Sequence, residues 1–73
     1  MVDILGYVVH QRVVLNLKSG TAVCGVVTEQ KRKFCVVRDA EVIDPGARTP
    51  TRADGRLVVG RSEIDYIQLL EER

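Results

Sequence analysis

Apolar and polar residues alternate through much of this chain, with the period of two that is typical of half-buried β-strands. The clearest run covers residues 12–18, where Val13, Leu15 and Leu17 fall on one side of the predicted strand. The next run has Gly25 at its centre, and a glycine inside a strand marks a bend or a close approach of two backbones. The pattern predicts five strands, over residues 12–18, 21–29, 34–43, 56–59 and 64–70.

The segments before, between and after these strands have other residue patterns. Residues 2–11 have helical spacing of apolar positions and a capping residue at Asp3, so we expect a short N-terminal helix that covers one end of the sheet. Residues 44–55 begin with Asp-Pro-Gly and stay polar, which predicts a long solvated loop between the third and fourth strands. Residues 71–73 are charged and are expected to fray. The predicted fold class is mainly β: a small open barrel of five strongly bent antiparallel strands with one N-terminal helix.

The length of 73 residues predicts a single domain over 1–73. A chain of this size buries only about 60% of the surface of its unfolded state, so it is marginally stable alone. Self-association through unpaired edge strands commonly stabilises such small domains, and we expect it here. The net charge is only +1, so an interaction with nucleic acid would depend on where the cations are placed.

The two cysteines, Cys24 and Cys35, lie in apolar strands and are expected to be small buried residues, although a disulfide between them is left open. One histidine and no Cys-x-x-Cys spacing argue against a metal site. The candidate nucleophiles and carboxylates form no catalytic arrangement, so we predict neither an enzyme nor a cofactor. No signal peptide or membrane-spanning segment is recognisable, and a cytoplasmic location is the default expectation.

Two stretches resemble the signatures of the Sm/LSm/Hfq superfamily of ring-forming, RNA-associated proteins. The first is Val13-x-Leu15-x-Leu17-x-Ser19-Gly20-x-x-Val23-x-Gly25-x-Val27, and the second is Val58-Val59-Gly60-Arg61-Ser62-Glu63-Ile64-x-x-Ile67. Between them, Asp39-Ala40 follows an apolar strand, as in the family. The resemblance spans residues 12–69. We expect a sequence of this kind among the relatives with divergent loops that occur in bacteria and bacteriophages.

The resemblance implies a homo-oligomeric ring of five to seven subunits in which the fourth strand of one subunit pairs with the fifth strand of the next. The residues expected at this joint are Leu57, Val58, Val59, Ile64, Tyr66 and Ile67. It also implies that two loops line a central pore and hold single-stranded, uridine-rich RNA. The residues expected to bind RNA are Gln30, Lys31, Arg32, Lys33, Phe34, Gly60, Arg61 and Ser62.

The cations Lys31, Arg32 and Lys33 are an ordinary solvated hairpin tip in a single chain. In a ring of six they would place about eighteen positive charges around one rim, which favours phosphate binding. Arg61 is expected either to contact a base or to pair with Glu63. Phe34 is expected either to stack on a base or to close the barrel core.

The predicted function is therefore that of a non-catalytic RNA-binding ring, acting as an RNA chaperone or as a platform for RNA processing. An alternative is a ring that serves as a protein-interaction scaffold without nucleic acid. A third reading, a monomeric SH3-like module that binds peptides, is disfavoured because such grooves are rich in aromatic residues and this chain has only 4%.

Overall fold

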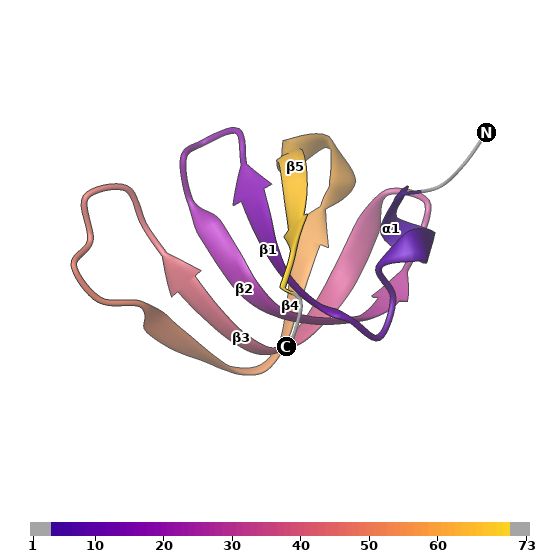
Figure 1. Ribbon diagram of the computed structural model, residues 1–73, viewed down its shortest axis with the longest axis horizontal. Coiled ribbons are helices and arrows are strands. Elements are labelled where there is room, and N and C mark those ends of the chain that lie inside the picture. Colours follow the sequence, from indigo (N-terminus) through magenta and orange to yellow (C-terminus); the bar gives the residue numbers. More distant parts are fainter. Residues whose placement is uncertain (1–3, 71–73) are drawn as a thin grey trace.

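Five antiparallel strands form a single bent sheet in the computed structural model, which describes residues 4–70 (Figure 1). The predicted cap at Asp3 and the predicted polar end at 71–73 lie outside the described residues. The sheet has the order β4-β3-β2-β1-β5, so that β4 and β5 are its two edges. The strands are β1 (Arg12–Leu17), β2 (Ala22–Gln30), β3 (Phe34–Ile43), β4 (Thr51–Gly60) and β5 (Ile64–Leu69).

The core is built from the alternation that the sequence displays. Val13 and Leu15 of β1 are fully buried, as are Val27 of β2 and Val37 of β3. Further buried residues of this cluster are Val8, Val23, Cys35, Ala40 and Val59. Burial of these apolar side chains supplies most of the driving force for folding.

The N-terminal helix is shorter than predicted. Only one helical turn, α1 (Ile4–Tyr7), is present in place of the helix expected over 2–11. After α1 the chain continues to His10, which has a positive φ of 69°. The backbone N–H of His10 donates to the carbonyl of Val27 at 2.6 Å. The backbone of residues 10 and 11 therefore bonds to Val27 of β2 instead of continuing a helix. Val8 is nevertheless buried in the core, so the segment does cover part of the sheet.

The prediction of a long polar loop over residues 44–55 is also wrong for the second half of that segment. Residues 51–55 belong to β4, which is ten residues long rather than the four residues expected over 56–59. Thr51, Arg52 and Ala53 pair with β3, and a bulge opposite Asp39 accommodates Gly55 at a φ of 77°. Polar residues are tolerated here because β4 is an edge strand with most of its side chains in water.

Gly25 is placed where β2 and β3 bend together, as its position in the strand pattern predicts. A Cβ atom at this residue would lie 2.6 Å from Cγ1 of Val37 and 2.8 Å from the carbonyl oxygen of Arg38. The β2–β3 register shifts at the same point, between Cys24 and Val26. The two backbones therefore approach too closely for any side chain.

We expect Gly25→Ala to lower the free energy of unfolding by about 1–3 kcal/mol, because the added methyl group forces the two strands apart. Gly60→Ala is the matched control, since its Cβ would find no atom nearer than 3.9 Å and its φ of −68° suits any residue. Urea denaturation followed by circular dichroism measures both. Equal midpoints for the two variants would contradict this account of the bend.

Candidate nucleic-acid interface

Two loops that are distant in sequence are joined at one end of the sheet. The first, residues 31–33, connects β2 to β3, and the second is the 3₁₀ turn η1 (Arg61–Glu63) between β4 and β5. The backbone N–H of Arg61 donates to the carbonyl of Lys33 at 2.9 Å. The Arg61 Nη1 atom donates to the carbonyls of Lys31 at 3.2 Å and Arg32 at 3.3 Å. We call these two joined loops the basic rim.

The first loop is a tight hairpin, closed by a hydrogen bond of 2.7 Å from the N–H of Lys31 to the carbonyl of Phe34. Its three cationic side chains are exposed. The Lys31 Nζ atom lies 3.5 Å from a carboxylate oxygen of Glu29, in a solvated ion pair that contributes little to stability. Since the carbonyls of this loop are held by Arg61, its cations project from a fixed backbone.

The basic rim surrounds an open hollow of about 420 Å³ lined by Arg32, Lys33, Arg61 and Ser62. These are four of the eight residues that the sequence resemblance implies for RNA binding. Guanidinium and ammonium groups around an open hollow suit the phosphates of a nucleic acid, which they bind by charge-assisted hydrogen bonds.

The other four predicted residues lie beside this hollow without lining it. Lys31 follows the end of β2, and Gln30 ends that strand with its Oε1 atom buried and unpaired among the described residues. Phe34 begins β3 opposite Gly60, and the residue is 37% exposed, so it is neither fully in the core nor free in solvent. The role of each of these residues in binding remains a prediction.

The sequence predicts that Arg61 contacts a base or pairs with Glu63. It does not reveal the hydrogen bonds from Arg61 to the first loop. These bonds join residues about thirty positions apart and form only once β3 and β4 are paired. In the structure Arg61 is therefore a positioning residue that orients the first loop, and its guanidinium also faces the hollow.

Cys35 lies beneath the basic rim and is fully buried. Burial raises the pKa of the Cys35 thiol above its ordinary value, and the positive charge of Arg61 offsets part of this rise. Cys24 pairs with Glu41 and Cys35 pairs with Gln30, so the two thiols are about 20 Å apart along the strands. No disulfide within the chain is possible at that separation, and both cysteines are free.

We expect a thiol reagent such as Ellman's reagent to modify Cys24 first in the native protein, because Cys24 is only half-buried. Cys35 should react only after unfolding in guanidinium chloride, since its thiol is inaccessible and its raised pKa keeps it protonated at neutral pH. The Cys35→Ser variant identifies which thiol reacts. Equal rates for the two thiols in the native state would show that Cys35 is not buried under the basic rim.

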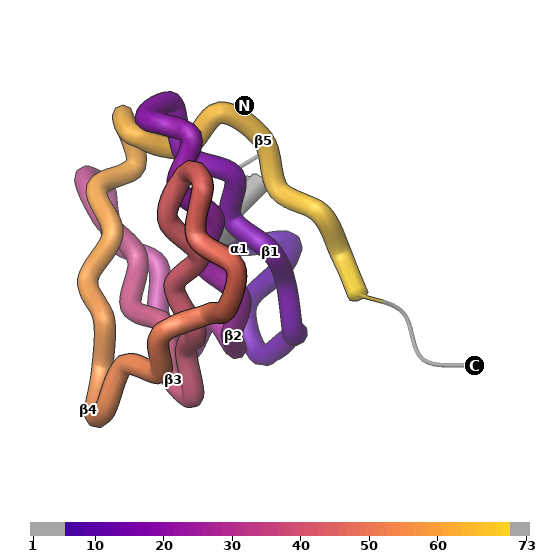
Figure 2. Tube along the Cα trace, turned by 90° about the vertical axis from the view of Figure 1, so that its left-hand side faces the viewer, coloured from indigo at the N-terminus to yellow at the C-terminus, as the bar shows by residue number. Residues whose placement is uncertain are grey.

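The predicted joint residues lie on the two edge strands, which face opposite sides of the molecule (Figure 2). Val58 of β4 is 61% exposed and Tyr66 of β5 is 60% exposed. The others point inward: Leu57, Ile64 and Ile67 are half-buried, and Val59 is part of the core of the chain itself. An apolar hollow of about 310 Å³ runs along β4 and is lined mainly by Leu17, Val23, Val42, Leu57, Val58 and Val59.

Within residues 4–70, the structure shows neither a cluster of metal ligands nor a membrane-spanning helix. No three histidine, cysteine or acidic side chains in this part of the chain lie close enough together to hold a metal ion. Nor does any described helix have the length and apolar character needed to cross a membrane.

Comparison with known proteins identifies the fold. No protein-family model and no curated protein sequence matches the chain. Among solved structures, it is similar to the Pyrococcus abyssii Sm protein in complex with a uridine heptamer, with a TM-score of 0.76 and 23% identity over 93% of this chain and 94% of that one. A heptameric archaeal Sm protein gives a TM-score of 0.76 with 19% identity over 93% and 97% of the two chains.

A chain of the NatC complex bound to CoA is similar as well, with a TM-score of 0.75 and 10% identity over 97% of this chain and 88% of that one. These likenesses show that the protein has the Sm fold, as the sequence resemblance implies.

Proposed function

We propose that this protein assembles into a homo-oligomeric ring and binds single-stranded RNA at its basic rim, without catalysing a reaction. The single observation that carries the proposal is the joining of the two loops by Arg61, which fixes three exposed cations beside an open hollow. The Sm protein of Pyrococcus abyssii, which shares the fold, is described in complex with a uridine heptamer.

Ring assembly is supported by the edges of the sheet. Among residues 4–70, β4 and β5 each have one side without a strand partner, and they lie at opposite ends of the strand order. A contact between two different edges is heterologous, and it closes into a ring when the rotation per subunit divides a full turn. Pairing β4 of one copy with β5 of the next would satisfy unpaired backbone groups and cover Val58 and Tyr66.

Assembly would also compensate for the modest charge of one chain. The net charge of +1 gives little attraction for RNA, whereas a ring brings the basic rims of all subunits together. A phosphate backbone held there would displace condensed counterions, so the affinity would fall steeply with salt. Preference for uridine is part of the proposal, as are the subunit number of five to seven and a role in RNA pairing or processing.

A protein-interaction scaffold is the second candidate. One observation favours it: a chain with the same fold occurs in the NatC complex bound to CoA. In that case the exposed edges and the apolar hollow along β4 would contact other proteins, and the basic rim would be a solvated loop.

Filter binding of labelled oligouridine and oligoadenine at low and moderate salt separates the two candidates. We expect tight retention of oligouridine at low salt, weaker retention of oligoadenine and a strong loss of both as the salt rises. Weak retention of both oligonucleotides that does not change with salt would contradict RNA binding and favour the scaffold.

A further inference from the structure

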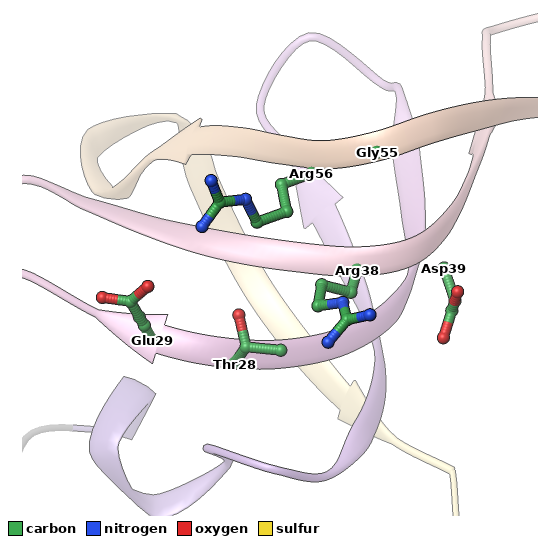
Figure 3. A pocket seen from close by; sticks show the side chains of 6 residues that line it. All are labelled: Thr28, Glu29, Arg38, Asp39, Gly55 and Arg56. Carbon is green, nitrogen blue, oxygen red and sulfur yellow. The ribbon is translucent and has the colours of Figure 1, made fainter.

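A second polar hollow lies on the sheet away from the basic rim, where β2, β3 and β4 bend together. Its volume is about 610 Å³, and it is lined by Thr28, Glu29, Arg38, Asp39, Gly55 and Arg56 (Figure 3). It shares no residue with the hollow of the basic rim. We call it the bend hollow.

Arg38 of β3 and Arg56 of β4 are directly opposite each other in the strand register. Side chains at such positions start about 5 Å apart, and like charges placed there destabilise a sheet. The next charged pair along the same strands is Glu41 opposite Arg52, which has the complementary signs. Neither Arg38 nor Arg56 forms a salt bridge with any residue between 4 and 70.

Two carboxylates, Glu29 and Asp39, also line the bend hollow beside the two arginines. Glu29 is already paired with Lys31 at 3.5 Å. Asp39, which has a left-handed φ of 51° opposite the bulge, lies on the side of Arg38 away from Arg56 (Figure 3). Since Glu29 is shared with Lys31 outside the hollow, Asp39 is the one lining carboxylate without a salt bridge to another cation among residues 4–70.

The bulge also keeps the bend hollow open. The register between β3 and β4 shifts between Arg38 and Ala40, so that Gly55 lies in the hollow's wall. A Cβ atom built on Gly55 would meet nothing within 4 Å, which means that this wall is bare backbone facing open space. A ligand group can therefore approach the hollow past Gly55. In Figure 3 the two guanidinium groups point toward opposite ends of the hollow, Arg56 toward the Glu29 side and Arg38 toward Asp39, so a phosphate held between them requires both exposed side chains to turn toward it.

We propose that the bend hollow binds a phosphate group between Arg38 and Arg56. Each guanidinium presents parallel N–H donors that match two phosphate oxygens, and a dianion between the two arginines would convert their repulsion into attraction. The phosphate belongs either to an RNA backbone or to a small phosphorylated molecule. Arg38 and Arg56 are outside the basic rim, so this site can be tested separately from the proposed function.

The test is thermal unfolding of the full chain in phosphate and in chloride at equal ionic strength and fixed protein concentration. Arg38→Gln and Arg56→Gln remove the site. Arg52→Gln is the matched control, with the same loss of charge on the same strand but opposite Glu41. A ligand that binds only the folded state raises the unfolding temperature.

We expect the unfolding temperature of the wild type and of Arg52→Gln to rise in phosphate by the same amount. Arg38→Gln and Arg56→Gln should lose most of that rise and should unfold at a higher temperature than the wild type in chloride, because the repulsion is relieved. The proposal is overturned if phosphate acts no differently from chloride on the wild type, or if both site variants respond to it as the wild type does.

Oligouridine binding by the same variants in chloride distinguishes the two sources of phosphate. If the ligand is an RNA phosphate, Arg56→Gln should reduce the slope of log affinity against log salt by about one, and Arg52→Gln should not. Unchanged RNA binding together with a lost phosphate response supports a small phosphorylated ligand. Failure of the wild type to bind RNA would contradict the proposed function and leave the phosphate test of this site intact.

Discussion

Replacing Val58 with aspartate should convert the proposed ring into single chains while leaving each chain folded. The Val58 side chain is 61% exposed on the edge strand β4, so an aspartate there stays in water when the chain is alone. In a ring it would be buried against the β5 edge of the next copy, near the equally exposed Tyr66. Burial of an unpaired charge costs several kcal/mol, so the proposed joint would be strongly weakened.

Light scattering at micromolar protein concentration measures this effect, and circular dichroism checks that the variant is folded. Ile43→Asp is the matched control, because Ile43 is 39% exposed on β3, which has a neighbouring strand on each side. We expect Ile43→Asp to keep the mass of the wild-type ring. If Val58→Asp also keeps that mass, the β4 edge is not a subunit joint.

Replacing Lys31, Arg32 and Lys33 together with glutamine should lower the affinity for oligouridine by about two orders of magnitude or more at low salt. In the proposed ring every subunit would lose three cations, so the loss would be multiplied around the ring. The ring itself should persist, because Arg61 binds the backbone carbonyls of this loop rather than its side chains. The slope of log affinity against log salt should fall as well, since fewer counterions are released on binding.

The control is a second triple variant, in which exposed cations outside both loops are changed to glutamine: Arg12, Arg48 and Arg52. It removes the same charge from each subunit and should change the affinity much less. Equal losses in the two variants would mean that overall charge, and not the basic rim, governs binding. Unchanged affinity in the first variant would remove the loop from the site.

The strands were predictable from the sequence wherever apolar alternation was strong. The start of β3 at Phe34 and the bend at Gly25 are confirmed, because both follow from local residue types. The first half of β4 was not predictable. Residues 51–55 are polar, and only their register with Ala40, Glu41 and Val42 of β3 makes them a strand.

The candidate sites likewise have some features that the sequence shows and others that only the structure shows. The three cations of the first loop are visible in the sequence, as is the turn at Gly60 and Arg61. The bonds from Arg61 to that loop are not, because they depend on how β3 and β4 are paired. The opposition of Arg38 and Arg56 depends on a bulge one residue long, which no periodicity reveals.

The Sm fold alone leaves the function open, since chains of this shape occur both in an Sm protein in complex with a uridine heptamer and in the NatC complex bound to CoA. What favours RNA for this chain is the side-chain chemistry of the basic rim. That chemistry is effective only if several copies present it together.

Sedimentation velocity of the wild type with fluorescently labelled oligouridine therefore tests ring assembly and RNA binding in one measurement. At micromolar protein and low salt, we predict that the label sediments with a single species of five to seven chains of 8.1 kDa and is released from that species as the salt is raised. Protein that sediments as single chains, with the label remaining at the position of free oligonucleotide, would contradict the account.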